Sequence, residues 1–313
     1  MLAHVVRGGF VESVHRACAV VTDPSGGIER AWGDPSGLVF PRSANKPLQA
    51  VGMVEAGLSL PPALLALVCS SHSGEARHQD TARAILASAG LTETDLRNTP
   101  DYPVEERERE AWLRADRPAT SLAQNCSGKH AGMLATTVAN GWSLPDYLDP
   151  DHPLQRAITA AISRLACAGA PVGAIAVDGC GAPLHGIPLH GLAHGFGTLA
   201  AAAAGTPEAE VGEAMRAHPE MVGGARRQVT ILMEQVPGLV AKDGAESVYA
   251  VGLPDGRGVA VKVVDGHTRA KSVVLAAILR SLEVGTDHAY AALEDVPVLG
   301  HGQPVGAVVA AGL

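Results

Sequence analysis

The residues of this chain with the clearest capacity for chemistry are serines and lysines. Ser43 and Lys46 stand three residues apart within Arg42-Ser43-Ala44-Asn45-Lys46-Pro47. A three-residue offset puts two side chains on one face of a helical turn, so the lysine amine can reach the serine hydroxyl. A neutral lysine beside a serine is a known form of activated nucleophile. Alone, this spacing also fits a solvated lysine one turn from a capping serine.

The proline after this pair predicts where a helix begins. Proline disfavours a helical residue before it and is favoured in the first helical turn, so we expect a tight turn ending at Lys46 and a helix starting at Pro47. An apolar stripe supports this helix. It consists of Val51, Val54 and Leu58. The dipole at its start would disfavour an ammonium, and the backbone amides after Ser43 would hold an oxyanion.

Two further segments extend the serine and lysine order. The stretch 69–75 carries Ser71 and His72 in a polar turn, which is either a helix cap or part of a pocket. Lys242 precedes Asp243 and Gly244 and a predicted strand, so its side chain would project from a strand edge. Serine acyl-transfer enzymes of the penicillin-binding kind combine a Ser-x-x-Lys helix, a second serine and a Lys-x-Gly strand. The order of the three segments here matches that combination.

Two thiol-bearing segments suggest a different chemistry. They are Asn125-Cys126-Ser127-Gly128-Lys129-His130 and Asp178-Gly179-Cys180-Gly181. Two thiolates and a neutral lysine could hold a metal, although this spacing is poor for zinc, and His130 and His185 are more conventional ligands nearby. The cysteines could instead be reactive thiols, since a helix start and a lysine both lower a thiol pKa. Asp178 follows the strand-like run 172–177, where it could hold an ammonium group or complete a plain turn.

Composition limits the class of protein. The chain has 313 residues, enough for one large domain or two lobes, and its 47% hydrophobic and 18% charged residues exclude a disordered protein. Aromatic residues make up only 3%, so the core must pack from small and aliphatic side chains with close backbone approach. A net charge of -8 argues against a nucleic-acid partner, which requires basic surface.

Location is indicated by the apolar segments and the cysteines. Charged and polar residues occur within the first dozen positions, unlike a secretory signal, and the weakly polar stretch 195–205 is far shorter than the roughly 20 residues of a membrane span. Five widely spaced cysteines indicate thiols in a reducing compartment. We therefore expect a cytoplasmic protein without a membrane partner.

The order of predicted elements indicates an α/β (α+β) fold. Strands are expected over 15–22, 28–32, 239–241, 247–252 and 258–264. Helices are expected over 47–58, 61–68, 78–90, 106–114, 130–140, 153–168, 192–203, 208–217, 222–235 and 268–282. Strands at both ends with helices between predict an antiparallel sheet formed by both termini. The expected lobes are a sheet lobe of about 1–60 and 237–313 and a helical lobe of about 61–236.

With these residues assembled, the chain resembles the rhizobial-type, or class 3, L-asparaginases, the asparaginase II family. The resemblance covers most of the chain, and its Asn-Cys-Ser-Gly-Lys-His string is highly specific. Its motifs are Arg42-Ser43-x-x-Lys46-Pro47, Cys69-x-Ser71-His72-Ser73, Asn125-Cys126-Ser127-Gly128-Lys129-His130, Asp178-Gly179-Cys180 and Lys242-x-Gly244-Ala245. The resemblance implies a single catalytic domain over 1–313 with a fold like the serine β-lactamases and glutaminases. It also implies a homodimer that hydrolyses L-asparagine to L-aspartate and ammonia.

Site residues follow from the same resemblance. It implies two catalytic pairs, Ser43 with Lys46 and Ser71 with Lys242. It further implies zinc (Zn²⁺) held by Cys126, Lys129 and Cys180, with solvent completing the shell. The candidate substrate-binding residues are Arg42, His72, Asp178, Asn125 and Gly244. The segment after Cys180 varies in the family, so substrate preference is less well specified than the chemistry.

Three other functions fit some of these residues. A penicillin-recognising serine hydrolase and a glutaminase-like enzyme share the serine and lysine order. A thiol- or metal-dependent amino-acid sensor, without catalysis, would use only the two cysteines and Lys129. Ammonia release from asparagine and glutamine separates the enzymes from the sensor, and a chromogenic β-lactam assay separates the two kinds of hydrolase.

Overall fold

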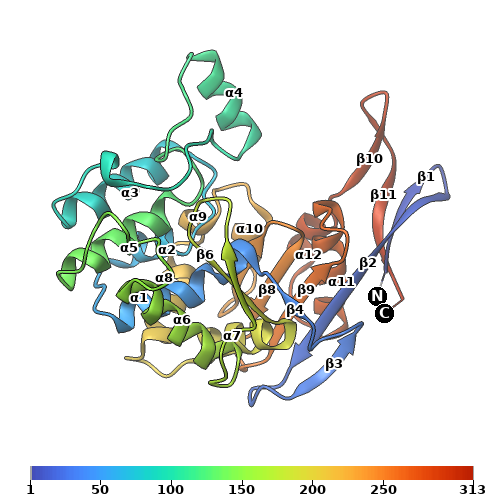
Figure 1. Ribbon diagram of the computed structural model, residues 1–313. Helices are drawn as coiled ribbons and strands as arrows, with labels where there is room; N and C mark the ends of the chain where they lie inside the picture. Colours follow the sequence, from blue (N-terminus) through green and yellow to red (C-terminus); the bar gives the residue numbers. More distant parts are fainter. Residues whose placement is uncertain (1, 313) are drawn as a thin grey trace. The chain divides into compact units, whose positions relative to one another are not determined.

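A computed structural model describes residues 2–312, and their side chains from residue 3 (Figure 1). The chain forms two compact units. The sheet unit comprises Met1–Ala44, Ile187–Ala201 and Ile231–Leu313, and the helical unit comprises Asn45–Gly186 and Ala202–Thr230. This division differs from the expected lobes, because the segment from Asn45 to residue 60 belongs to the helical unit, and Ile187–Ala201 and residues 231–236 belong to the sheet unit.

An antiparallel sheet of eight strands organises the sheet unit. Its strand order is β10-β11-β1-β2-β9-β8-β7, with β3 also paired to β2. The strands are β1 (Leu2–Arg7), β2 (Phe10–Thr22), β3 (Ile28–Trp32), β7 (Val240–Gly244), β8 (Val248–Gly252), β9 (Gly258–Val263), β10 (Pro297–Gly300) and β11 (Gln303–Ala311). Leu2 pairs with Ala311, so the terminal strands lie side by side, as Figure 1 shows. The prediction of an antiparallel sheet formed by both termini is therefore confirmed.

Helix α7 (Leu189–Ala201) packs unusually close to this sheet. A Cβ atom placed on Gly252 would lie 1.8 Å from the carbonyl oxygen of Phe196, and one on Gly258 would lie 1.8 Å from that of Ala193. Only glycine allows the backbone of the helix to approach the strands to this distance. The expected core of small residues with close backbone approach is confirmed here.

Further elements of the sheet unit lie outside the eight-stranded sheet. They are β4 (Leu38–Val39), η3 (Thr268–Ala270), α11 (Lys271–Ser281) and α12 (Asp287–Glu294). Strand β4 pairs with Ile187 and Pro188, and α11 packs against β8, β9 and β11.

The helical unit is built from helices that pack in pairs. They are α1 (Lys46–Glu55), α2 (Pro62–Val68), α3 (Ala76–Ser88), α4 (Glu106–Arg114), α5 (Ser127–Ala139), α6 (Pro153–Ala166), α8 (Pro207–Ala217) and α9 (Pro219–Val222). Helix α1 packs on α6, α3 on α5 and α2 on α8. A short 3-10 helix, η2 (Glu93–Asp95), and a hairpin of β5 (Ala174–Val177) with β6 (Pro183–Pro188) complete the unit.

Most predicted elements are present, and one helix was wrong. The interval 222–235 is divided, because α9 ends at Val222 and α10 (Gln228–Gln235) starts after Gly223 and Gly224. Gly224 has a φ of 134°, a conformation that interrupts a helix. Strands β1, β10 and β11 and helix α12 were not predicted. Within residues 2–312, no helix is long and apolar enough to cross a membrane.

Candidate active site

A 3-10 turn, η1 (Arg42–Asn45), carries Ser43 and continues directly into α1. The helix begins at Lys46, one residue before the predicted start, and Pro47 occupies its first turn, where a missing N–H removes no helical hydrogen bond. Arg42 has a φ of 53°, which is rare for a residue with a side chain. The Ala44 amide donates to the carbonyl of Pro41 at 3.1 Å, so it is already occupied, unlike the free oxyanion donor expected after Ser43.

The end of strand β7 lies against this turn, within the sheet unit. A Cβ atom on Gly244 would lie 2.4 Å from the carbonyl oxygen of Pro41 and 3.4 Å from the amide nitrogen of Ser43. Any side chain at this position would displace the backbone that carries Ser43. The structure thus brings together two of the predicted residues, Gly244 and Ser43.

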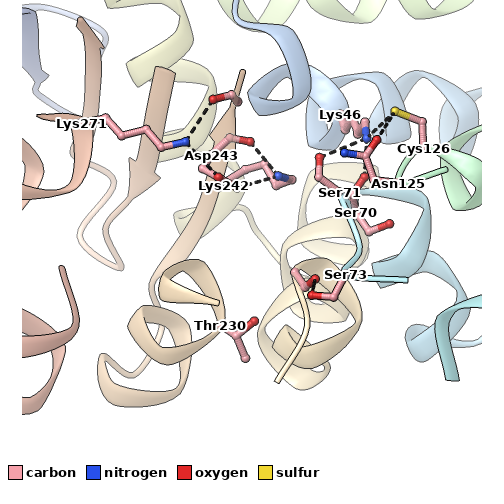
Figure 2. Close-up of polar contacts among 12 residues, drawn as sticks. Lys46, Ser70, Ser71, Ser73, Asn125, Cys126, Thr230, Lys242, Asp243 and Lys271 are labelled. Atoms are coloured by element: carbon pink, nitrogen blue, oxygen red, sulfur yellow. Dashed lines mark hydrogen bonds and ion pairs between the residues drawn. The ribbon is translucent and has the colours of Figure 1, made fainter. Parts of the chain in front are cut away.

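Lys242 lies two residues earlier on β7 and is fully buried. Its Nζ donates to the backbone oxygen of Asp243 at 2.7 Å and to a carboxylate oxygen of Asp243 at 3.0 Å. Lys271, at the start of α11, donates to the other carboxylate oxygen of Asp243 at 3.0 Å (Figure 2). Lys242 therefore belongs to a buried charge network that the sequence did not reveal.

Lys46 is the centre of a second group, within the helical unit. Its side chain is buried, and its Nζ donates to the carbonyl of Ser70 at 2.5 Å, to Ser71 Oγ at 3.2 Å and to Cys126 Sγ at 3.1 Å (Figure 2). These three acceptors match the three hydrogens of an ammonium group. The lysine of the first motif thus contacts the serine of the second motif.

Backbone hydrogen bonds hold the segment that presents Ser71. The Ser71 amide donates to the carbonyl of Val222 at 3.0 Å, and the Ser73 amide donates to that of Gly223 at 2.8 Å. The segment joins α2 to α3 without regular secondary structure, and residues 69–74 are buried. The tight turn after α9 therefore orients the serine that faces Lys46.

The two predicted catalytic pairs each divide between the units. Ser43 belongs to the sheet unit and Lys46 to the helical unit, whereas Ser71 belongs to the helical unit and Lys242 to the sheet unit. Both pairs stay predictions. The pair with a hydrogen bond inside one unit is Lys46 with Ser71.

The two predicted thiol segments meet in the helical unit. Lys129, in the first turn of α5, donates to Cys180 Sγ at 3.3 Å, and Cys126 is hydrogen-bonded to Cys180. This thiol hydrogen bond lowers the pKa of Cys180 to about 4 and raises the pKa of Cys126 to about 12. Burial opposes the charge on Lys129, but Cys180, Cys126 and Asp178 outweigh it and raise the lysine pKa.

These residues fit a zinc ion only with lysine as the third ligand. Two thiols and an amine converge and are buried, and sulfur and nitrogen are the donors that zinc prefers. Among residues 2–312, no group of three His, Cys, Asp or Glu side chains could hold a metal. The conventional candidates, His130 and His185, are buried, with hydrogen bonds to Tyr147 and Thr159. Burial lowers both their pKa values, to about 4 for His185, so both are neutral.

Four predicted substrate-binding residues remain. His72 is buried, and one of its ring nitrogens is 2.8 Å from the hydroxyl of Ser127. The side-chain oxygen of Asn125 accepts a hydrogen bond from Cys126 Sγ at 3.2 Å. Asp178 is half-buried and accepts from the Gly179 amide, and Arg42 is half-buried. A substrate role for these four residues stays a prediction.

Sequence reasoning missed Asp243 and Lys271. Asp243 stands between Lys242 and Gly244 in the sequence motif. Its position next to a predicted catalytic lysine could have indicated an ion pair with that lysine. Lys271 is 29 residues beyond Lys242, and nothing in the spacing connects them. Only the packing of α11 on the sheet brings its amine to Asp243.

A scan against protein-family models decides the identity of the chain. The model described as L-asparaginase II matches residues 3–310, which is nearly the whole length. The chain belongs to the L-asparaginase II family. It is thus an enzyme, an L-asparaginase, and the resemblance in its motifs is confirmed. No curated protein matches it significantly.

Solved structures give weaker likenesses to this L-asparaginase. A β-lactamase (Mb2281c) from Mycobacterium bovis is 14% identical, with 80% of this chain and 88% of that chain covered and a TM-score of 0.34. A putative β-lactamase from Bacteroides dorei is 16% identical, with 85% and 94% covered and a TM-score of 0.42. EstCE1, a hydrolase with promiscuous acyltransferase activity, is 12% identical, with 80% and 90% covered and a TM-score of 0.40. At these TM-scores, nothing about the activity of this chain follows.

Proposed function

We propose that this L-asparaginase hydrolyses L-asparagine to L-aspartate and ammonia through a serine acyl-enzyme activated by lysine. The observation that carries the proposal is the buried amine of Lys46, which is 3.2 Å from Ser71 Oγ. A buried lysine with a serine in reach is the arrangement that base-activated nucleophiles use. The family match supplies the substrate class, an amide of a small amino acid.

The contacts of Lys46 limit where a proton can pass. When the amine is neutral, its lone pair must face a group that donates a hydrogen. Of its three partners, the carbonyl of Ser70 has none, and the Cys126 thiol already donates its hydrogen to the side-chain oxygen of Asn125 at 3.2 Å. The hydroxyl of Ser71 then remains as the donor to the neutral amine. Lys46 is thus suited to exchange a proton with Ser71 whichever serine attacks.

The proposed reaction has two stages. Ser43 Oγ gives its proton to Lys46 and attacks the side-chain carbonyl carbon of asparagine. The carbon–nitrogen bond then breaks, and ammonia leaves with a proton delivered through Ser71, paired with Lys242. Water attacks the resulting ester and restores the Ser43 hydroxyl, which releases aspartate. An uncharged lysine is required at the start of each stage.

We also propose that Cys126, Lys129 and Cys180 hold zinc when the metal is bound. Zinc there would act as a Lewis acid that attracts the charged end of the substrate. The half-buried carboxylate of Asp178 would orient the substrate's ammonium group. We infer a cytoplasmic location and a homodimer as well, and sedimentation velocity of the purified chain tests the homodimer.

One experiment tests the function. Ammonia release is measured from asparagine and from glutamine, with and without a chelator, for the wild type, Ser43→Ala and Ser71→Ala. We expect release from asparagine, and loss of turnover in Ser43→Ala with zinc still bound. Retained turnover in Ser43→Ala with loss in Ser71→Ala would transfer the attack to Ser71. No release from either amide by the wild type would overturn the proposed function.

A further inference from the structure

Lysine is rare in this chain, and most of its lysines are buried. The sequence contains only five lysines beside 19 arginines, so positive charge is mostly carried by arginine. Four of the five lysines are buried. Three of these four, Lys46, Lys129 and Lys242, already have proposed roles in catalysis or zinc binding. The fourth is Lys271, whose side chain is only 10% exposed and which has no assigned role.

Lys271 makes two hydrogen bonds to the end of strand β7. Its Nζ donates to a carboxylate oxygen of Asp243 at 3.0 Å and to the backbone oxygen of Gly244 at 3.1 Å. The other carboxylate oxygen of Asp243 accepts from Lys242 at 3.0 Å (Figure 2). One carboxylate therefore lies between two buried lysines, and all three belong to the sheet unit.

This placement costs free energy. Lys271 is the first residue of α11, and a cation at a helix N-terminus is opposed by the helix dipole. Burial of a cation is also unfavourable unless it is paired and hydrogen-bonded. An aliphatic side chain would pack there without either cost. The position of Lys271 is therefore better explained by its contacts to Asp243 and Gly244 than by packing.

We propose that Lys271 is a positioning residue for Lys242, and this inference rests on the proposed role of Lys242 in proton transfer. Lys271 acts in two ways. Its bond to the Gly244 carbonyl holds the strand end that lies against the turn of Ser43. Its positive charge offsets the carboxylate of Asp243, which would otherwise hold a proton on Lys242. Lys271 itself is not expected to touch the substrate.

The charges around Lys242 determine the direction of the expected effect. Asp243 faces it from its own strand, and Lys271 faces that carboxylate from α11. The neighbouring strand β8 contributes the phenol ring of Tyr249, 5.9 Å from the Lys271 amine. Loss of Lys271 leaves the Asp243 charge unopposed and favours protonated Lys242. Loss of the Asp243 charge has the opposite effect.

The test compares the pH profiles of kcat/KM for asparagine in four variants. Lys271→Met should move the acidic limb to higher pH by about one pH unit, and Asp243→Asn should move it to lower pH. Lys271→Arg keeps the charge and should keep the wild-type profile with at most a modest loss of rate. Lys262→Met is the matched control, because this half-buried lysine on β9 also donates to backbone carbonyls, those of Glu246 and Val263.

Each result decides between two explanations. Shifts of Lys271→Met and Asp243→Asn in opposite directions support the proposal, since loss of packing would lower rates without opposite shifts. An unchanged profile in Lys271→Met, or a Lys271→Arg profile that matches Lys271→Met, overturns it. If Lys271→Met fails to fold, a Lys271→Arg profile whose acidic limb is shifted from that of the wild type overturns the proposal, because this variant keeps the charge. Full activity in Lys242→Met would instead overturn the proposed function of Lys242.

Discussion

At the scale of single residues, Lys46 contacts both a predicted catalytic serine and a predicted zinc-binding cysteine. Its amine touches the hydroxyl of Ser71 and the thiol of Cys126, which are respectively a predicted catalytic group and a predicted zinc ligand. A change in the charge of one partner therefore alters the electrostatic environment of the other. Each residue of this group can be tested by substitution because the contacts are specific.

Substitution of Lys46 by methionine removes the proposed base but keeps much of the side-chain volume. We expect kcat to fall by roughly 10²–10⁴-fold, the usual contribution of a general base. Steady-state ammonia release measures the loss, and far-ultraviolet circular dichroism checks the fold. Lys262→Met, on a lysine without a predicted role, should retain activity. A Lys46→Met enzyme with normal kcat would contradict the assignment of Lys46.

The thiol pair predicts a pH-dependent stability of the metal-free protein. The hydrogen bond from Cys126 lowers the pKa of Cys180 from 9.0 to about 4 in the folded state. A lowered folded-state pKa contributes stability that is complete above the unfolded pKa and is lost as the pH falls toward the folded one. We therefore expect the free energy of unfolding to rise between about pH 4 and pH 9.

Urea unfolding of chelator-treated protein at several pH values measures this dependence. Cys180→Ala should show a flatter rise over the same interval, because the thiolate is absent. Cys167→Ser is the control, since Cys167 lies outside the thiol pair, and it should keep the wild-type slope. An equal slope in Cys180→Ala and the wild type would contradict a thiolate at Cys180.

At the scale of elements, close backbone contacts position the site. Glycines allow α7 to rest on β8 and β9, and Gly244 allows the end of β7 to rest on the turn of Ser43. These contacts leave no room for a methyl group. The low aromatic content therefore agrees with an interior that is filled by close packing of helix and strand backbones rather than by large side chains.

Gly252→Ala tests this packing away from the candidate residues. The new methyl group would lie 1.8 Å from the Phe196 carbonyl oxygen, so α7 or β8 must move. Overpacking typically costs about 1–3 kcal/mol of stability. Thermal unfolding followed by circular dichroism measures the loss. Gly37→Ala is the control, because its new methyl group would lie under 3 Å only from a side-chain oxygen of Asp34, at 2.9 Å, and it should cost less stability than Gly252→Ala.

Element prediction succeeded where the sequence pattern is local. Helix α4 was expected at its observed bounds, and strand β8 within one residue, because their apolar spacing and turn residues act over a few positions. Strands β1 and β11 were missed since they pair with each other across about 300 residues of sequence, and Gly306 interrupts the apolar residues of β11. No local rule contains that pairing.

At the scale of the whole molecule, zinc binding should increase the free energy of unfolding. A ligand that binds only the folded state stabilises it by about 2.7 kcal/mol at a free concentration of 100 times Kd. We expect added zinc to raise the Tm of chelator-treated enzyme. Cys126→Ser should lose most of this increase, whereas Cys167→Ser should keep it. Equal increases in both variants would place the metal elsewhere.

The sequence by itself determined the family of this protein. The Ser-x-x-Lys pair, the Asn-Cys-Ser-Gly-Lys-His string and the lysine before Gly244 identified an asparaginase, because reactive groups must be present as particular residue types in short, recognisable segments. Only the tertiary structure decided which groups are hydrogen-bonded to one another. Lys46 contacts Ser71 and Cys126, and Lys271 contacts Asp243, because helices and strands distant in sequence pack together. Hydrogen bonds depend on distance in space, which local spacing does not record.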